Sequence, residues 1–402
     1  MTHIVVVGAG QAGSSLVVKL RKEGFTGPIT LIGAEPFPPY QRPPLSKAYL
    51  LGETERERLF LRPARYYADA DIALKLGVPA SDIDLAARTL MVGDETICYD
   101  KLAITTGLDA RRLPAEQGGA LGNVHIVRTL EQVDALKPRL RAAGHLLVIG
   151  GGYIGLEAAA VARKLGLKVT LLEMADRILR RVACRETSDY FRTLHTAHGV
   201  DILEGVGLGR LIGDRDVSGA EHDDGVLPDI DIAIVGIGLS PRCEIAEKAG
   251  LAMENGVCVD ETGRTSDPSV WAAGDCAAIS YRGTRIRLES VQNAIEQAET
   301  VALNMMGPQI SYDPKPWFWS DQYDVKLQIA GLSHGHDRVI VRPGSSEGSQ
   351  SNWCYQGDLL LSVDAMNDPR AYMIGKRLIE CGASPAPDLV ADPSTQLKSL
   401  LS

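Results

Sequence analysis

The sequence predicts an α/β protein with two parallel-sheet domains and a further domain at the carboxy-terminal end. One pattern, a β-branched run followed by a glycine-rich turn and a helix, occurs near the amino terminus and again at mid-chain. Such runs are typical of strands buried on both faces of a parallel sheet. The length of 402 residues allows two to three domains. Pro314 and Pro316 mark the last boundary, because two prolines interrupt a continuing element.

The first pattern begins with a predicted strand at residues 4–7 and continues as a helix over residues 14–20. Its turn contains Gly8, Gly10 and Gly13. In this setting the first glycine permits the turn, the second lets the backbone approach a pyrophosphate, and the third lets helix and strand pack closely. The helix N-terminus offers unpaired N–H groups to phosphates. The pattern predicts a dinucleotide site; the alternative is a glycine-rich turn that binds nothing.

An acidic residue follows the next predicted strand, residues 29–33. Glu35 lies 27 residues after Gly8. A carboxylate at this place accepts hydrogen bonds from the hydroxyls of an adenosine ribose. We therefore expect Glu35 to hold the ribose of the first dinucleotide.

The second pattern repeats the first. A predicted strand at residues 146–149 leads into Gly150, Gly152 and Gly155, and a helix is expected over residues 156–165. Two such patterns predict two dinucleotides, and a flavin with a nicotinamide nucleotide is the economical pair.

Glu173 bears on which nicotinamide nucleotide is used. It ends the predicted strand 168–173, 23 residues after Gly150. A carboxylate there holds the ribose 2′-hydroxyl of NAD and repels the 2′-phosphate of NADP. Arg177, Arg180 and Arg181 follow closely and offer an alternative phosphate site, although solvated surface charges are the simpler interpretation. The sequence favours NADH.

Composition excludes several classes of protein. Hydrophobic residues make up 45% of the chain, which is ordinary for a globular protein, and the net charge of −9 argues against nucleic-acid binding. No apolar run is long enough to span a membrane, and no signal peptide is recognisable. The seven cysteines contain no Cys-x-x-Cys pair, so neither a disulfide framework nor a zinc site is expected. The expectation is a cytoplasmic protein without a metal cluster of its own.

With both patterns in place, the chain resembles the FAD-dependent oxidoreductases of the glutathione-reductase fold. More narrowly, it is similar to the ferredoxin reductases that serve bacterial cytochrome P450 and ring-hydroxylating dioxygenase systems. The resemblance covers essentially the whole chain, and residues 42–47 (Arg-Pro-Pro-Leu-Ser-Lys) and 317–322 (Trp-Phe-Trp-Ser-Asp-Gln) are its most specific markers. Further markers lie at residues 103–107, 235–238, 270–276 and 289–294.

The resemblance implies a domain order. The FAD domain would comprise residues 1–108 and 237–312, interrupted by an NADH domain at 109–236. Residues 313–402 would form an α+β carboxy-terminal domain that covers the flavin and meets the partner.

The resemblance also implies roles for individual residues. Lys47 would lie beside the flavin near N5, Glu157 would face the nicotinamide and flavin, and Trp319 would lie on the acceptor side. The alternatives are a surface lysine, an exposed first-turn acid that stabilises its helix, and a core aromatic. The FAD contacts expected are Gly8, Gly10, Ala12, Gly13, Glu35, Arg42, Lys47, Val78, Thr106, Gly107, Arg128, Gly274, Asp275, Glu289, Ser290, Val291 and Trp319. The NADH contacts expected are Gly150, Gly152, Tyr153, Ile154, Gly155, Glu173, Gly236, Ile237 and Gly238.

The expected reaction follows from a missing thiol. Residues 35–60 contain no cysteine, and a buried Cys276 is expected to act as a small hydrophobe. The reduced flavin would then pass electrons directly to a [2Fe–2S] ferredoxin in a transient complex. The alternatives are a rubredoxin reductase, an NADH oxidase or peroxidase, and a nucleotide-sensing protein similar to apoptosis-inducing factor.

Two groups of basic residues are candidates for surface positions. Because the chain is acidic overall, ferredoxin docking would need a local positive area. The histidine pairs 195/198 and 334/336 are expected to lie on the surface. The candidate docking residues are Arg282, Arg285, Arg287, Arg338 and Arg342.

Overall fold

The computed structural model describes residues 1–401. The chain divides into two compact units, each assembled from separate stretches of sequence. The first unit contains residues 1–42, 55–109 and 239–316. The second contains residues 43–54, 110–238 and those from 317 onward.

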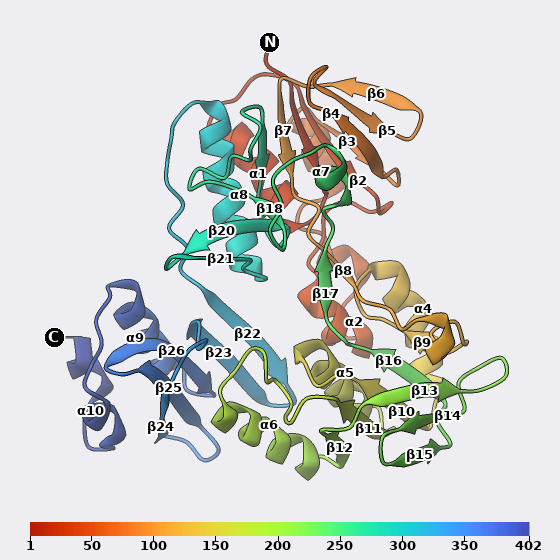
Figure 1. The fold of residues 1–402 in the computed structure, drawn as a ribbon, viewed down its shortest axis with the longest axis vertical. Coiled ribbons are helices and arrows are strands. Elements are labelled where there is room, and N and C mark those ends of the chain that lie inside the picture. The colour runs from red at the N-terminus through yellow and green to blue at the C-terminus, as the bar shows by residue number, and fades with distance from the viewer. Residues whose placement is uncertain (402) are drawn as a thin grey trace. The chain divides into compact units, whose positions relative to one another are not determined.

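A five-stranded parallel sheet with strand order β19–β7–β1–β2–β3 forms the core of the first unit (Figure 1). Every residue of β1 (Ile4–Val7) and β2 (Ile29–Gly33) is buried, which explains their continuous apolar sequences. Helices α1 (Gln11–Lys22) and α8 (Val291–Met306) pack against each other and share one hydrophobic core with the sheet. The other strands of the sheet are β3 (Ile72–Leu76), β7 (Lys101–Ile104) and β19 (Val270–Ala272).

Smaller elements complete the first unit. The antiparallel sheet β4–β5–β6 follows β3 in the chain, and two short sheets, β18–β20–β21 and β17–β8, lie outside the main sheet. Their bounds are β4 (Ala80–Asp84), β5 (Thr89–Val92), β6 (Glu95–Cys98), β8 (Leu108–Ala110), β17 (Leu239–Pro241), β18 (Val257–Cys258), β20 (Ala277–Tyr281) and β21 (Thr284–Ile286), with helices α3 (Ala64–Asp69) and α7 (Glu244–Lys248).

A second parallel sheet, ordered β12–β11–β10–β16–β9, forms the centre of the second unit. Strand β10 (His145–Ile149) is buried throughout, and α5 (Tyr153–Lys164) packs on it. The remaining strands are β9 (Val124–His125), β11 (Lys168–Glu173), β12 (Val200–Glu204) and β16 (Ile232–Val235), with an antiparallel sheet of β13 (Leu208–Ile212), β14 (Gly219–His222) and β15 (Gly225–Pro228). The helices are α2 (Ala48–Leu51), α4 (Leu130–Ala142) and α6 (Arg185–Ala197).

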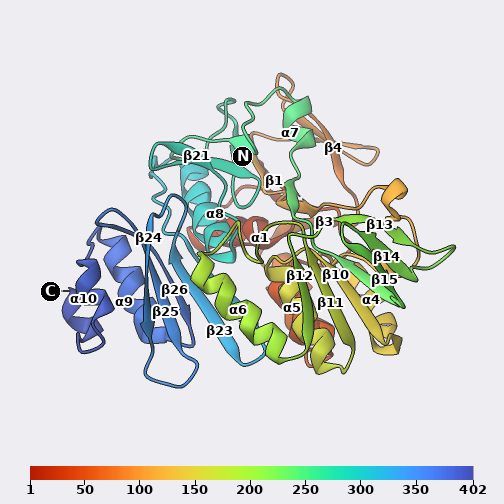
Figure 2. The same ribbon diagram turned by 60° about the horizontal axis from the view of Figure 1, so that its bottom comes forward.

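The carboxy-terminal residues add an antiparallel sheet, ordered β22–β23–β26–β25–β24, to the second unit. Figure 2 shows α6 between the strands β10–β12 and this sheet, and α9 on the far side of the sheet. The mixture of sheet and helices confirms the predicted α+β structure. The bounds are β22 (Trp317–Gln322), β23 (Val325–Gly331), β24 (Arg338–Pro343), β25 (Gln350–Gln356), β26 (Leu359–Met366), α9 (Pro369–Glu380) and α10 (Pro387–Ala391).

The predicted elements lie where the sequence places them, with small shifts at helix ends. Strands 4–7, 29–33 and 168–173 have the predicted bounds, but α1 and α5 each begin three residues earlier than predicted, directly after the middle glycine of the turn. Helix α8 begins at Val291, because the Ser290 side chain caps it by accepting a hydrogen bond from the Asn293 N–H at 3.1 Å. The three-domain division stays a prediction.

Candidate active site

The first glycine turn contains two glycines that the protein itself requires and one that it does not. A Cβ on Gly8 would lie 2.2 Å from the Thr105 carbonyl oxygen, and a Cβ on Gly13 would lie 2.0 Å from the Gly8 carbonyl oxygen. A Cβ on Gly10 would meet nothing within 4 Å. The open side at Gly10 is the space that a pyrophosphate needs for close approach to the backbone.

The helix that follows this turn has an uncapped N-terminus. Helix α1 has Gly10 at its N-cap, no side-chain cap and no acidic residue in its first turn. Helices α4, α8 and α9 are instead capped by the side chains of Thr129, Ser290 and Asp368. An uncapped N-terminus leaves N–H groups for an anion, so the turn fits a dinucleotide phosphate.

The second glycine turn is built in the same way. A Cβ on Gly150 would lie 2.4 Å from the Gly236 carbonyl oxygen, and one on Gly155 would lie 2.1 Å from the Gly150 carbonyl oxygen, whereas Gly152 again meets nothing within 4 Å. Helix α5 also lacks a side-chain cap and first-turn acid. The structure therefore contains two glycine turns of the same construction, one in each unit, and both fit a phosphate.

The two predicted ribose carboxylates lie at the carboxyl ends of β2 and β11. Glu35 accepts hydrogen bonds from the Tyr40 hydroxyl at 2.5 Å and from Arg42 Nη2 at 2.6 Å. Glu173 accepts from the Gly151 N–H and the Ala175 N–H, both at 2.7 Å. Each carboxylate oxygen has a second lone-pair direction, so both groups keep acceptor capacity for ribose hydroxyls.

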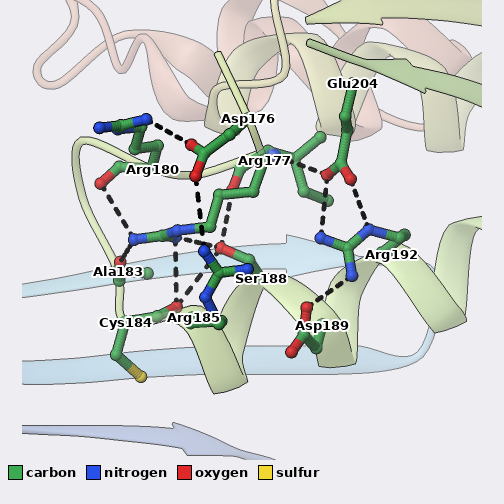
Figure 3. A network of polar contacts seen from close by, with 11 residues as sticks. Asp176, Arg177, Arg180, Ala183, Cys184, Arg185, Ser188, Asp189, Arg192 and Glu204 are labelled. Carbon is green, nitrogen blue, oxygen red and sulfur yellow. Dashed lines mark hydrogen bonds and ion pairs between the residues drawn. The ribbon is translucent and has the colours of Figure 1, made fainter.

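The arginines after Glu173 are largely committed to structural contacts (Figure 3). Arg177 donates to the Ser188 hydroxyl and to the carbonyls of Ala183 at 3.0 Å and Cys184 at 3.4 Å. Arg180 pairs with Asp176 at 2.5 Å. Arg181 is different, because its Nη1 lies within 3.2 Å of where a Cβ on Gly238 would be. Arg177 in particular holds the loop and is not available for a 2′-phosphate.

Several predicted FAD contacts gather at the carboxyl ends of the first unit's strands. Thr106 and Gly107 follow β7, and Gly274 and Asp275 follow β19 after Ala273. Gly274 has φ +79°, its N–H donates to Gln297 Oε1 at 2.9 Å, and a Cβ there would lie 2.9 Å from the Ala12 side chain. Val78 follows Gly77, whose N–H donates to the Glu35 carbonyl at 3.0 Å.

The predicted catalytic residues Lys47 and Glu157 form a partly buried ion pair in the second unit. Lys47 Nζ lies 2.8 Å from Glu157 Oε1. Ser46 donates to Glu157 Oε2 at 2.5 Å, and Ser320 donates to Oε1 at 2.6 Å. The alternative of an exposed first-turn acid is wrong, because Glu157 is the fifth residue of α5 and only 4% exposed. Sequence reasoning missed both serines, although each lies in one of the two specific sequence markers.

Strand β22 presents aromatic residues on both of its faces. Phe318 stacks on Tyr153 with ring centroids 4.4 Å apart, whereas Trp319 lies 5.5 Å from Trp317 and is partly exposed. Burial raises the pKa of Tyr153. Because side chains alternate along the strand, Phe318 and Ser320 lie on the face toward α5. Trp319, which is predicted to face the acceptor, lies on the opposite face.

The remaining predicted contacts stay predictions. Arg128 directly precedes the N-cap Thr129 of α4, and Glu289 pairs with Arg287 at 2.9 Å. Gly236 follows β16, and its N–H donates to the Ile149 carbonyl at 2.7 Å. Ile154 is the second residue of α5, and Ile237 is 37% exposed.

Three basic residues that were expected on the surface are buried. His195 is not on the surface but fully buried. Arg342 is a wrong docking candidate, because it is buried and donates to four backbone carbonyls, those of Val390, Asp392, Pro393 and Thr395. Arg287 is also mostly buried and donates to the Asp275 carbonyl.

Cys276 is buried as predicted, and burial raises the pKa of its thiol. Residues 1–401 contain no group of three or more histidine, cysteine, aspartate or glutamate side chains suited to a metal ion. None of the helices described over this range is long and apolar enough to cross a membrane.

Two parallel sheets, each with an open glycine turn and an uncapped helix, define a dinucleotide-dependent oxidoreductase with two nucleotide sites. The chain belongs to the pyridine nucleotide-disulphide oxidoreductase family, whose model matches residues 2–298; a reductase C-terminal model matches residues 317–401. As a member of this family it uses FAD and NAD(H), which fit the two glycine turns.

Similar proteins extend the match over the whole chain. Rhodocoxin reductase of Rhodococcus erythropolis is 43% identical over 98% of this chain and 93% of its own length. Putidaredoxin reductase of Pseudomonas putida is 39% identical over 99% of this chain and 96% of its own. The covalent putidaredoxin reductase–putidaredoxin complex superposes with a TM-score of 0.95 at 39% identity, covering 100% of this chain and 98% of that one.

Proposed function

We propose that this chain is a NADH-dependent ferredoxin reductase that passes electrons through FAD to a [2Fe–2S] ferredoxin serving an oxygenase. The observation that carries the proposal is the Lys47–Glu157 pair: the segment after Glu35, where disulfide reductases of this fold carry a thiol, holds a fixed cation and no cysteine. The similarity to rhodocoxin and putidaredoxin reductases supports the same acceptor class.

The chain's own groups would bind and orient both nucleotides. The turns at Gly10 and Gly152 would hold the phosphates, Glu35 and Glu173 the riboses, and Asp275 a ribityl hydroxyl. Glu173, with Arg177 tied into its loop, supports NADH over NADPH. Because NADH is produced in the cytoplasm, the activity belongs to that compartment, which cell fractionation would test.

The catalytic contribution of the protein would be electrostatic. When bound, FAD would supply the capacity to take a hydride from NADH and to release two electrons singly. Glu157 holds the Lys47 ammonium in place, and a fixed cation in a partly buried site favours negative charge nearby. The N–H groups at the start of α8, near Val291, would act in the same direction. Trp319 would provide the aromatic surface toward the acceptor.

A stopped-flow experiment on the FAD-loaded protein tests the proposal. NADH and NADPH are compared as reductants, and ferredoxin, rubredoxin and hydrogen peroxide as oxidants. We expect rapid flavin bleaching by NADH alone and rapid reoxidation by ferredoxin. Faster reoxidation by rubredoxin would assign the other acceptor. Fast peroxide turnover would contradict the proposal, because that chemistry needs a reactive thiol beside the flavin and Cys276, the cysteine next to Asp275, is buried.

A further inference from the structure

Behind Glu157, a line of buried polar side chains runs away from the ion pair through the second unit. Ser320 donates to Glu157 Oε1 at 2.6 Å, Gln322 Nε2 donates to the Ser320 hydroxyl at 3.1 Å, and His195 Nε2 lies 2.7 Å from Gln322 Oε1. Ser320, Gln322 and His195 are each at most 1% exposed. Strand β22 supplies the two middle members. Side chains alternate along a strand, so Ser320 and Gln322, which are two residues apart, lie on the same face.

The chemistry of these groups fixes the direction of every hydrogen bond. Glu157 receives Lys47 Nζ and the Ser46 hydroxyl, so it is the acceptor at the end of the line. Ser320 has one hydrogen, which goes to Glu157, and its oxygen must accept from an N–H of Gln322. The Gln322 carbonyl oxygen therefore turns to His195, which must carry its hydrogen on Nε2.

The outer end of the line fits this tautomer. His195 Nδ1 is left as an acceptor, and the Tyr323 hydroxyl lies 3.4 Å from it. The Tyr323 ring stacks on His198 at 3.7 Å and lines an open pocket of about 400 Å³ together with Arg163, Lys164 and Asp324. Burial lowers the pKa of His195 to about 4; the Gln322 hydrogen bond opposes this and the neighbouring His198 adds to it. His195 is thus neutral at physiological pH, and a neutral ring is what the direction of the hydrogen bonds requires.

We propose that His195, Gln322 and Ser320 are positioning residues that hold Glu157 as a fixed carboxylate through a one-way line of hydrogen bonds. This inference rests on the proposed function, in which the Lys47–Glu157 pair acts beside the flavin. Each member donates toward Glu157, and the line ends on Oε1, the oxygen that also contacts Lys47 Nζ. The other oxygen, Oε2, accepts from Ser46. No proton needs to move along the line for this role.

The tautomer of His195 is the direct test. Nitrogen-15 NMR of the FAD-loaded protein labelled at histidine gives the protonation of each ring nitrogen, and the His195→Gln variant assigns the signal. We expect a neutral ring with hydrogen on Nε2 from pH 6 to pH 8.5. Hydrogen on Nδ1, or a charged ring at pH 7, would overturn the proposal.

Variants test the effect on the site. His195→Phe and Gln322→Leu break the line, His195→Gln returns an N–H donor near the Nε2 position, and Phe191→Leu alters a buried neighbour on α6 that is outside the line. In both broken variants Ser320 loses the contacts behind it, so Glu157 holds the Lys47 ammonium less firmly beside the flavin. We expect flavin reduction by NADH to slow by about tenfold in these two variants. His195→Gln and Phe191→Leu should keep the parent rate.

Because a less firmly held Lys47 ammonium stabilises added electrons less, the bound flavin's midpoint potential should move to a more negative value in the two broken variants, and in neither of the others. If all four variants share one rate of flavin reduction and one potential, the line has no positioning role. That result differs from failure of the proposed function, in which the unsubstituted protein would not reduce ferredoxin although the NMR signal would still report the His195 tautomer. Should His195→Phe fail to fold, Gln322→Leu and the tautomer measurement decide the matter.

Discussion

Glu157 is held by groups from two distant segments of the sequence, which together compensate its buried charge. It is 4% exposed and depends on Lys47, Ser46 and Ser320 for its hydrogen bonds. Removing one partner of a buried ion pair leaves the other charge uncompensated, which costs more than the pair itself contributes.

We therefore predict that Lys47→Met lowers the free energy of unfolding by about 3 kcal/mol. Adding Glu157→Gln to it should recover most of that loss, because no buried charge remains. Urea unfolding of the parent, both single variants and the double variant measures the coupling. Additive effects would mean that the two side chains do not stabilise each other.

The residues around the second ribose carboxylate give a second prediction. Glu173→Ala removes the acceptor for a 2′-hydroxyl and the repulsion of a 2′-phosphate, so the preference for NADH over NADPH in kcat/KM should fall by about tenfold or more. Arg177→Ala is the contrasting variant: its side chain ties Ala183, Cys184 and Ser188 together, so thermal stability should fall while the preference persists. A gain of NADPH selectivity from Arg177 substitution would contradict this reading of the loop.

At the scale of secondary-structure elements, the two strand–turn–helix units make a prediction that separates folding from binding. Gly10 and Gly152 have φ −95° and −78°, which alanine adopts without strain, and a Cβ at either meets no protein atom within 4 Å. Gly10→Ala should therefore fold normally but bind FAD weakly, and Gly152→Ala should retain FAD but raise the KM for NADH. Flavin content and steady-state kinetics measure both effects.

Gly13→Ala provides the control at the same turn. Its Cβ would lie 2.0 Å from the Gly8 carbonyl oxygen, so the helix has to move away from the strand. Loss of soluble, folded protein is expected here, in contrast to Gly10→Ala. Equal behaviour of the two variants would show that the open side at Gly10 has no ligand-binding role.

The sequence predicts these elements well because each depends on neighbours in the chain. A buried strand, a glycine turn and the following helix lie within about twenty residues, so the spacing of nearby residues predicts how they pack. The groups around Glu157 could not be found this way: Ser46 lies 111 residues from it, Ser320 lies 163, and the His195–Gln322 contact spans 127. His195 also sits among polar residues on α6, so its sequence context resembles that of an exposed side chain.

The burial of the charged Arg342 side chain could not be predicted from the sequence either. An arginine on an edge strand is normally solvated, but β24 places this one against the last residues of the chain, where carbonyl groups need donors. The four contacts appear only when the strand and the chain end are both folded.

At the scale of the whole molecule, stability should depend on pH through Asp364. Burial raises the pKa of this carboxyl from 3.8 to about 6, although hydrogen bonds from Thr187 and Cys184 oppose the rise. The folded state therefore binds this proton more tightly than the unfolded state. Its contribution to stability is lost as the pH rises from about 4 to 6, by up to about 3 kcal/mol.

Asp364→Asn removes this titration, so the parent should lose stability relative to the variant as the pH rises over that range. The difference in free energy of unfolding between parent and variant, measured from pH 4 to pH 8, checks the sign. A difference that is independent of pH would mean that Asp364 is not protonated in the folded protein at pH 5.

The chain passes between its two units five times, after residues 42, 54, 109, 238 and 316. During synthesis, the first unit lacks strand β19 and helix α8 until about residue 306 has been made. The segment 43–54 is made early, but Ser46 and Lys47 can contact Glu157 only after that residue has been made. The contact between Glu157 and Ser320 forms later still. A ribosome that stalls before Ser320 has been made thus releases a chain whose buried Glu157 lacks one of its partners. Quality control at this stage would act on the whole polypeptide and not on one finished half.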